Sequence, residues 1–353
     1  LRMQVSCGQF SYANINPACI LGVSGTLSAL TKYEKEVMSR YKIDLYSDAP
    51  SVYGPRDQTF DTAGEGIIMA ETRGDYFKAI VNKINVFSRD PNGKKHRAII
   101  VFFDSAKRIE EFRLSSYFRQ IVDHSAVECL TEALESNDRD QIIKKASSLG
   151  QVTLATKAFG RGTDFRAGDD VVARGGVHIL QTFLSPMKTE EIQVMGRSAR
   201  QGQKGSYGMV LMMQDAHVLG ADGKTPEPEP DTLEAFGITT AELNGTPHKD
   251  WHYYLSEKRT ARRMNESIAI EKDLVQATER DKLTRQYVDA LVQNNTRQAC
   301  ELFKDIYTQL KGSAQSQGGL HVVFVLDESG SMDGAPFREL RSAYSAFIQQ
   351  HIK

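Results

Sequence analysis

The sequence has little of what marks several protein classes at first sight. Its 353 residues include only four cysteines, scattered at Cys7, Cys19, Cys129 and Cys300. They are too few for a disulfide scaffold and too far apart for CxxC-type metal ligation, so a reducing compartment is expected. No run of about 18 apolar residues occurs, so no membrane-spanning helix is expected either.

A charge excess of either sign is also absent. The 44 Lys and Arg residues against 45 Asp and Glu give a net charge of −1, and 40% of the residues are hydrophobic. This ordinary globular composition removes the strongest composition argument for a nucleic-acid binder, although a local basic face can hide in the average. The chain opens Leu1-Arg2-Met3 without the segments of a secretory signal, and we expect a fragment.

Short β-rich runs alternate with helical patterns between residue 97 and about residue 213. The predicted strands are 97–103, 151–155, 176–183 and 208–213, and the predicted helices between them are 108–122 and 139–149. This alternation predicts an α/β fold, a doubly wound parallel sheet with helices on both faces. In such folds ligands gather where strands end and loops begin.

The pattern changes after Met213. Glycines and alternating prolines over 220–230 predict an exposed insertion or linker. Residues 252–311 predict two long amphipathic helices, broken near Asn294-Asn295, and Gly-Ser-Gln residues over 312–319 predict a flexible linker. The Arg259 to Arg263 cluster could touch phosphate or lipid, but nearby glutamates favour a solvated helix face.

One candidate site follows the predicted strand at 151–155. Gly160-Arg161-Gly162-Thr163-Asp164 places an arginine between two glycines and an acid shortly after it. The glycines allow close backbone approach to a ligand, and Arg161 can meet phosphate. Asp164 can accept from a ribose hydroxyl or hold a neighbouring arginine. The simpler interpretation is a Gly-rich turn with an internal Arg/Asp pair.

A second candidate site lies about 30 residues later. Ser185 and Pro186 suit the N-cap and first position of a helix, which is expected to carry the run from Gln193 to Gly202. On one helix Gln193, Arg197 and Arg200 share a face. Arginines on one face repel each other unless an anion lies opposite, and a triphosphate suits paired guanidinium groups. The alternative is a solvated basic helix end.

Two elements that nucleotide chemistry usually needs are missing or misplaced. The GK[ST] of a P-loop occurs only at Gly223-Lys224-Thr225, where the first glycine position is Val218 and prolines follow, so we interpret it as a decoy. A Walker B look-alike at 323–328 comes after the arginine motifs instead of before them. We therefore expect no ATP hydrolysis by this chain alone, and a parent protein with ATPase activity would supply both elements from elsewhere in its chain.

The look-alike is better interpreted as a DxSxS sequence at a strand end. Asp327, Ser329 and Ser331 offer three hard oxygen ligands suited to Mg²⁺. The segment resembles the metal-ion-dependent adhesion site at the start of a von Willebrand factor A domain. The alternative is a Ser/Gly-rich turn that caps a helix, and metal binding by this chain alone is doubtful.

The arginine motifs resemble a known family. ATxxxxRGxD followed by QxxGRxxRxG is similar to motifs V and VI of the second RecA-like domain of superfamily 2 motors. Within that group, Gly175 to Ile179, Gly196 to Gly202 with Gly205-Ser206, and Gly22-Val23-Ser24-Gly25-Thr26 resemble the SecA protein-translocation ATPase. The resemblance covers roughly residues 5–215. Thr182-Phe183-Leu184 and Ala199 depart from the SecA pattern.

The resemblance implies roles for the candidate residues. Arg161 and Asp164 would face ATP across a cleft, Arg197 and Arg200 would contact the γ-phosphate, and Gln193 would orient that network. The cofactors implied are ATP and Mg²⁺. Gly160 and Gly162 would complete the ATP-binding motif.

The resemblance also implies an organisation and a set of partners. The expected parts are the end of a first motor domain (1–60), the second RecA-like domain (61–215), a loop (216–250), a helical segment (251–311), a linker (312–319) and the start of the von Willebrand A domain (320–353). Expected partners are the first motor domain, unfolded polypeptide or membrane translocation machinery, and a protein ligand of the A domain. An intracellular place, cytoplasmic or organellar with peripheral membrane association, is implied. A nucleic-acid motor and a non-catalytic scaffold remain alternatives.

Overall fold

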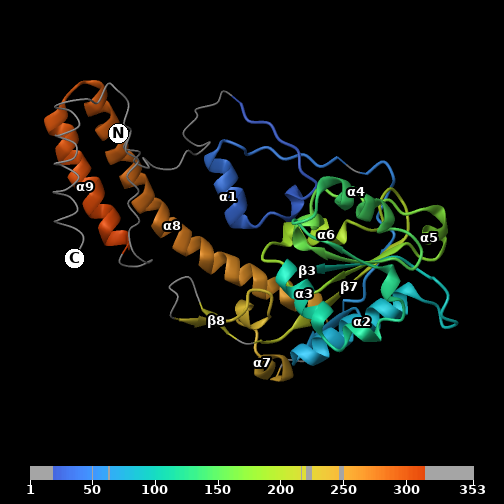
Figure 1. Ribbon diagram of the computed structural model, residues 1–353. Helices are drawn as coiled ribbons and strands as arrows, with labels where there is room; N and C mark the ends of the chain where they lie inside the picture. Colours follow the sequence, from blue (N-terminus) through green and yellow to red (C-terminus); the bar gives the residue numbers. More distant parts are fainter. Residues whose placement is uncertain are drawn as a thin grey trace, which may run out of the picture. The chain divides into compact units, whose positions relative to one another are not determined.

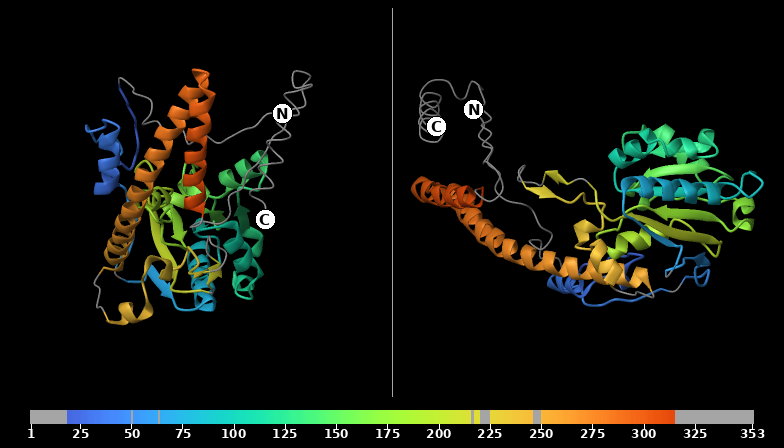
Figure 2. Two further views of the ribbon diagram at one scale, coloured as in Figure 1. Left: turned by 90° about the vertical axis from the view of Figure 1, so that its left-hand side faces the viewer. Right: turned by 90° about the horizontal axis from the view of Figure 1, so that it is seen from below.

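The computed structural model of the chain describes residues 19–49, 51–62, 64–215, 217–219, 225–245 and 250–314. Residues 17–269 form one compact unit, and the described residues 270–314 belong to a second. Within these described ranges no helix combines the length and the apolar character needed to cross a membrane. Figures 1 and 2 show the larger unit as a twisted sheet covered by helices.

The larger unit is built on a seven-stranded parallel sheet. The strand order is β1-β7-β6-β3-β5-β4, and β2 also pairs with β7. The strands are β1 (Gln58–Thr59), β2 (Ile67–Ala70), β3 (Ile99–Phe103), β4 (Val127–Leu130), β5 (Val152–Thr156), β6 (Val177–Gln181) and β7 (Gly205–Met212). The predicted doubly wound parallel sheet is confirmed, and the four predicted strands appear with ends that differ by a few residues. The sequence analysis missed β1, β2 and β4.

Alternate residues of β3 divide the core into two layers. Ile99, Val101 and Phe103 pack with α2 (Arg73–Ser88) and α3 (Ala106–Leu114). The opposite layer contains Ile100 and Phe102. It is covered by α4 (Ser136–Lys145), α5 (Asp169–Ala173) and α6 (Lys188–Met195). Because both faces of β3 are covered, its sequence is one continuous apolar run and does not alternate between apolar and polar residues.

Helix α3 begins close to the predicted position but stops early. Its N-cap Ser105 accepts a hydrogen bond from the backbone N–H of Arg108, as N-cap serines do. The prediction of a helix to residue 122 is wrong, because the chain turns extended at Ser115. The Ser115 hydroxyl donates to the Phe112 carbonyl at 2.7 Å, and a serine that bonds to backbone in this way competes with helical hydrogen bonds.

The segment after β7 returns to the domain. The hairpin of β8 (Val218–Leu219) and β9 (Pro226–Glu227) ends in an exposed stretch, as expected of an insertion. The expected exposure is wrong at Glu229, however, which is buried. Leu233, Phe236 and Ile238 join the core layer on the α6 side, ahead of α7 (Thr240–Gly245).

The buried side chain of Arg108 explains this return. Only 2% of Arg108 is exposed, and its Nε donates to Asp231 Oδ2 at 2.7 Å. Its Nη2 donates to Glu229 Oε2 at 2.5 Å and its Nη1 to Asp215 Oδ2 at 2.9 Å. A buried guanidinium is costly unless its donors find acceptors, so acidic residues pack against it. We call this group the Arg108 cluster: Arg73, Lys107, Arg108, Glu111, Asp215, Glu229 and Asp231.

Helix α8 (Trp251–Val292) is attached at its beginning to α6. Arg259 is 2% exposed and its Nη1 donates to Glu191 Oε2 at 2.8 Å. The ring Nε2 of His252 lies 2.7 Å from Glu191 Oε1. The prediction of a solvated face is therefore wrong for Arg259, whose charge is neutralised by a buried glutamate of α6.

The second unit contains the end of α8 and helix α9 (Thr296–Ala314). The prediction of two long helices with a break near Asn294 is confirmed, and Asn294 has a φ of 59°. Ala290 and Ala299 are buried, and the rings of Tyr287 and Phe303 are 6.0 Å apart. Helix α9 runs to Ala314, past the expected end at residue 311.

Candidate anion-binding site

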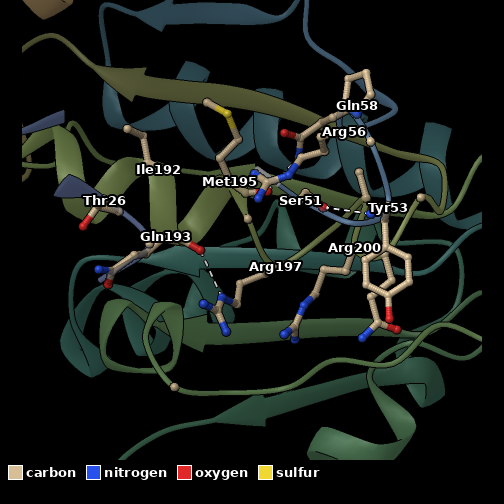
Figure 3. Close-up of a pocket in the computed structure, with 18 residues that line it drawn as sticks. Thr26, Ser51, Tyr53, Arg56, Gln58, Ile192, Gln193, Met195, Arg197 and Arg200 are labelled. Carbon is tan, nitrogen blue, oxygen red and sulfur yellow. Dashed lines mark hydrogen bonds between the residues drawn. The ribbon is translucent and has the colours of Figure 1, made fainter. Parts of the chain in front are cut away.

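A cavity of about 890 Å³ opens where four segments that are distant in the sequence meet. Its wall includes Gly25 and Thr26, the loop 51–58, Gly162 and the stretch from Ile192 to Gly202. Figure 3 shows Arg197 and Arg200 extending into this space from the turn that follows α6. The structure thus brings Gln193, Arg197 and Arg200 together with the glycine motif after β5.

The arginines do not lie on a helix face, and that prediction is wrong. Helix α6 ends at Met195 with Gly196 as its C-cap, and it begins at Lys188, after Met187 and not after Ser185. Gln58 Nε2 donates to the Met195 carbonyl at 2.7 Å and to Ser198 Oγ at 2.8 Å, which satisfies the helix end. The chain then turns through left-handed conformations at Ala199, Gln201 and Gly202. This turn, not helical periodicity, directs both guanidinium groups to the cavity.

Arg197 is held by backbone oxygens. Its Nε donates to the Gln193 carbonyl at 3.0 Å, and its Nη1 donates to the Thr163 carbonyl. Burial and the nearby charge of Arg200 lower the pKa of Arg197 below its ordinary value, while Asp164 opposes the shift. The side chain therefore connects the two candidate motifs.

Asp164 pairs with two arginines. Arg166 Nε donates to Asp164 Oδ2 at 2.6 Å, and Arg200 Nη1 donates to Asp164 Oδ1. The hydrogen bond from Arg166, together with the charges of Arg200 and Arg197, lowers the pKa of the Asp164 carboxyl. The Arg/Asp pair is thus present in the structure, and contact with a ribose hydroxyl remains a prediction.

The glycine motif differs residue by residue. Gly160 is buried, and a Cβ there would lie 2.6 Å from Val194 Cγ2, so only glycine allows this approach to α6. Gly162 lines the cavity with a φ of 69°. Arg161 is exposed and is not among the cavity-lining residues, although its charge acts on Glu190. Its predicted contact with nucleotide therefore rests on the resemblance alone.

The sequence analysis missed Arg56, which lines the same cavity. Burial and the charge of Arg200 lower the pKa of Arg56. Gly54-Pro55 predicts a turn, but nothing local shows that this turn meets a segment about 140 residues away. We call Arg56, Arg197 and Arg200 the cavity arginines. Among the described residues only Asp164 lies within ion-pair distance of any of them.

The shortage of carboxylates beside the cavity arginines determines which class of ligand the cavity suits. Of the three guanidinium groups only that of Arg200 pairs with a carboxylate among the described residues, so the cavity wall carries an excess of positive charge. Arginine presents planar pairs of N–H donors that match carboxylate and phosphate oxygens. The cavity is therefore a candidate anion site, and phosphate oxygens match the geometry of its donors.

Other predicted site residues lie elsewhere. Asp327, Ser329 and Ser331 lie outside the described residues, as do Gly223 and Lys224. Within the described ranges no group of three or more His, Cys, Asp or Glu residues is placed to hold a metal ion. The Mg²⁺ site and the von Willebrand A domain remain predictions.

Comparisons with known proteins agree with this geometry. Residues 77–202 match the helicase conserved C-terminal domain. The chain is 34% identical over 158 residues to protein translocase subunit SecA of Lawsonia intracellularis, covering 44% of this chain and 18% of that protein. It is 30% identical over 206 residues to SecA of Syntrophus aciditrophicus, covering 58% and 22%. The chain thus spans about a fifth of the length of these curated relatives.

Solved structures show a similar arrangement at low similarity. Domain 2 of the DEAD-box helicase Mss116p, bound to an RNA duplex, has a TM-score of 0.29 at 17% identity, covering 44% of this chain and 54% of that one. Dbp5 of S. cerevisiae, bound to RNA and ADP BeF3, has a TM-score of 0.32 at 16% identity, covering 51% and 43%. Likeness at this level does not assign a function.

The parallel sheet and the matched domain define the class of protein. Residues 77–202 form a domain of the helicase C-terminal type, with a RecA-like parallel sheet. Within that class, the similarity to translocase subunits is the more specific one. Residues 77–202 thus match the helicase C-terminal domain, and the chain is similar to part of SecA over the matched stretches.

Proposed function

We propose that this chain supplies the arginine side of a nucleotide site in an ATP-dependent, SecA-like motor. The excess of guanidinium groups in the cavity carries the proposal. A triphosphate provides several closely spaced anionic oxygens that would offset this charge. The volume of about 890 Å³ lies within the range of small-molecule sites, roughly 300 to 1,000 Å³.

Each candidate residue has a role in this proposal. Arg197 and Arg200 stabilise charge on the transferred phosphoryl group, a contribution typically worth about 10³ to 10⁵ in rate. Gln193 holds Arg197 in position through its carbonyl. Asp164 holds Arg200 until a phosphate competes for it, and can then accept from a ribose hydroxyl. A P-loop from the first motor domain of the parent chain binds the other side of the triphosphate, with Mg²⁺.

Unfolded polypeptide is the proposed cargo, because the similar relatives are protein translocase subunits by name. Acidic groups at the carboxyl edge of the sheet also support this choice over nucleic acid. Asp104 follows β3 and pairs with Lys157 at 2.6 Å, and Glu132 follows β4 and accepts from Thr156 at 2.9 Å. Open α/β sheets bind ligands at this edge, and Glu132, which has no cation within ion-pair distance among the described residues, would repel a phosphate backbone.

The remaining partners are proposed on the resemblance. A SecA-like motor would work at a protein-conducting machinery with peripheral membrane association. The von Willebrand A segment would add a protein ligand, and its Asp327, Ser329 and Ser331 would hold Mg²⁺. Clear polypeptide-independent binding of this chain to single-stranded RNA would instead favour the nucleic-acid motor.

Nucleotide binding tests the site directly. ATP and inorganic tripolyphosphate are titrated by calorimetry into the chain and into Arg200→Ala. We expect weak binding of both by the unchanged chain and a loss of about ten- to a hundredfold in the variant. The matched control is Arg113→Ala, since Arg113 lies on α3, is 48% exposed and pairs with Glu110 at 3.1 Å. Equal binding by Arg200→Ala and the unchanged chain would contradict the proposal.

ATP turnover tests the cargo. A longer SecA-like parent that includes a P-loop is assayed alone, with single-stranded RNA, and with unfolded polypeptide plus lipid vesicles. Stimulation by polypeptide and vesicles supports the translocase, and stimulation by RNA alone contradicts it. Residues 1–353 by themselves are expected to show no turnover. Magnesium-dependent hydrolysis that vanished in Arg200→Ala would contradict the division of the site between two domains.

A further inference from the structure

The loop 51–58 brings a charge to the cavity from outside the helicase-type domain. Arg56 precedes residue 77, where the match to the helicase C-terminal domain begins. In Figure 3 Arg56 comes from the segment that carries Tyr53 and Gln58, whereas Arg197 and Arg200 come from the turn after α6. The cavity therefore has a second basic wall that the family motifs do not include.

Neighbouring contacts fix the position of this wall. Gln58 donates to the Met195 carbonyl and to Ser198 Oγ at the end of α6. The N–H of Gly205 donates to the Asp57 carbonyl at 3.0 Å, and Gln58 is in register with Gly205 in the β1/β7 pair. Arg56 thus immediately precedes Asp57 and Gln58, which are hydrogen-bonded to Gly205 and to the segment at the end of α6.

Gly196 shows how close the guanidinium of Arg56 comes. A Cβ built on Gly196 would lie 3.4 Å from both Nη1 and Nη2 of Arg56. Gly196 directly precedes Arg197, so the guanidinium of Arg56 rests on the same turn that carries the other cavity arginines. It also lies at the C-terminal end of α6, where the helix dipole favours a cation.

Arg56 has no acidic partner among the residues that the structure describes. Within the described ranges, no Asp or Glu side chain lies within ion-pair distance of its guanidinium, while Arg200 has Asp164. The charges of Arg56 and Arg200 both lower the pKa of Arg197, which shows that the three groups repel one another. An anionic ligand in the cavity relieves this repulsion, and its phosphates would lie within reach of both walls.

We propose that Arg56 is a third phosphate-binding residue, which contacts the phosphates of a nucleoside triphosphate from a segment outside the helicase-type domain, with its guanidinium resting against the turn after α6. The inference rests on the proposed nucleotide site and extends it beyond the helicase-type motifs. If Arg56 has this role, the affinity for triphosphate depends on the paired N–H donors of its planar guanidinium as well as on its positive charge.

Two substitutions at Arg56 test this in the full chain. Arg56→Ala is expected to bind tripolyphosphate and ATP about tenfold more weakly, and Arg56→Lys about threefold more weakly, because lysine keeps the charge but loses the fork. Arg113→Ala again serves as the control with unchanged binding. Arg56 is exposed at the surface, so both variants should keep the thermal unfolding midpoint of the unchanged chain.

The outcomes separate this inference from the proposed function. Wild-type affinity in both Arg56 variants, with binding lost in Arg200→Ala, overturns the role of Arg56 and leaves the nucleotide site standing. Absence of tripolyphosphate and ATP binding by the unchanged chain overturns both. Weaker RNA binding by Arg56→Ala with unchanged ATP binding also overturns the inference, since the phosphates contacted would then belong to a polynucleotide.

Discussion

The Arg108 cluster and the cavity arginines use the same side chain in opposite ways. Arg108 is buried and has four carboxylates around it, from Glu111, Asp215, Glu229 and Asp231. Of the three cavity arginines, which border an open space, only Arg200 pairs with a carboxylate among the described residues. An arginine surrounded by acids is a structural element, whereas solvent-accessible arginines short of acids can bind an anionic ligand.

The pKa shifts follow the same division. Burial lowers the pKa of Arg108, but the hydrogen bonds and charges of Asp231 and Glu229 outweigh burial, so the net pKa is raised. Burial and the charge of Arg200 lower the pKa of Arg56, and no acid of the described chain compensates. The Arg108 cluster and the cavity arginines thus differ in the number of carboxylates near each guanidinium, and not in the arginines themselves.

Arg97 shows that lack of acid alone does not make a ligand site. It is 9% exposed, and burial lowers its pKa to about 10. Its donors go to neutral acceptors, the Gly176 carbonyl and Ser206 Oγ, both at 2.7 Å. A cavity that a ligand can enter is the second requirement, and Arg97 does not have one in the described structure.

Removing Arg108 should have the largest effect. Arg108→Ala leaves Asp231 buried without its cation and Glu229 with Lys107 alone, and breaking a buried pair in this way typically costs about 3 to 5 kcal/mol. The measurement is the free energy of unfolding in urea. A loss below about 1 kcal/mol would show that the cluster is solvated in solution and would remove the contrast with the cavity.

The next largest loss of folding stability is expected at low pH, through His178, whose pKa is influenced by Arg97. His178 is buried, its Nδ1 lies 2.7 Å from Ser206 Oγ, and its pKa is lowered well below 6.5 by burial and by the charges of Arg97 and Lys83. The folded state therefore resists protonation that the unfolded state accepts, so stability is full above pH 6.5 and falls as the pH drops below it. The loss reaches at most about 2 kcal/mol by pH 5.

Urea unfolding at pH 7, 6 and 5 measures this dependence. His178→Gln cannot be protonated and should show a smaller decrease over the same range. An identical pH slope in the variant and the unchanged chain would assign the acid sensitivity to other groups.

Arg200→Ala should change stability little while it removes binding. Its partner Asp164 is 45% exposed, and exposed ion pairs contribute only about 0 to 1 kcal/mol. Urea unfolding of this variant beside Arg108→Ala gives the comparison in one assay. A loss comparable to that of Arg108→Ala would mean that Arg200 is a structural arginine as well.

Asp164→Asn should have the smallest effect of these substitutions, and the direction of the change in tripolyphosphate affinity is the informative result. Removing the negative charge of Asp164, the described carboxylate that pairs with Arg200, leaves Arg200 available to phosphate, so affinity for tripolyphosphate should rise by about two- to fivefold. ATP should gain less if Asp164 also accepts from the ribose hydroxyl. Calorimetry with both ligands measures the ratio, and a decrease for tripolyphosphate would contradict competition between Asp164 and phosphate.

The sheet was predictable because its pattern is local. The continuous apolar run at 99–103 needs only a covered strand to explain it, and Ser105 follows as a helix cap. Strand β2 and helix α2 are equally apolar, but they lie outside the stretch where strands and helices alternate clearly in the sequence. Helix α3 was overextended because the Ser115 hydroxyl competes with the helix in a way that periodicity does not reveal.

The candidate site was predictable only in part, for a related reason. Gln193, Arg197 and Arg200 were found through their motif. Gln193 lies on α6, whereas both arginines follow the end of that helix, in a turn with left-handed backbone at Ala199 and Gln201. Arg56 and the partners of Arg108 depend on contacts more than 100 residues apart in the chain. Such contacts are set by the tertiary fold, which single-sequence patterns do not contain.

The Arg108 cluster also has a consequence in time. Arg108 and Asp231 are 123 residues apart, so the ribosome, adding about 5 to 20 residues per second, makes Asp231 roughly 6 to 25 seconds after Arg108. During that interval the chain can be synthesised to the end of β7, the last strand of the sheet. Until Asp231 is made, the buried guanidinium of Arg108 has only part of its carboxylate partners. Completion of the domain therefore waits for a segment that lies beyond the last strand of the sheet.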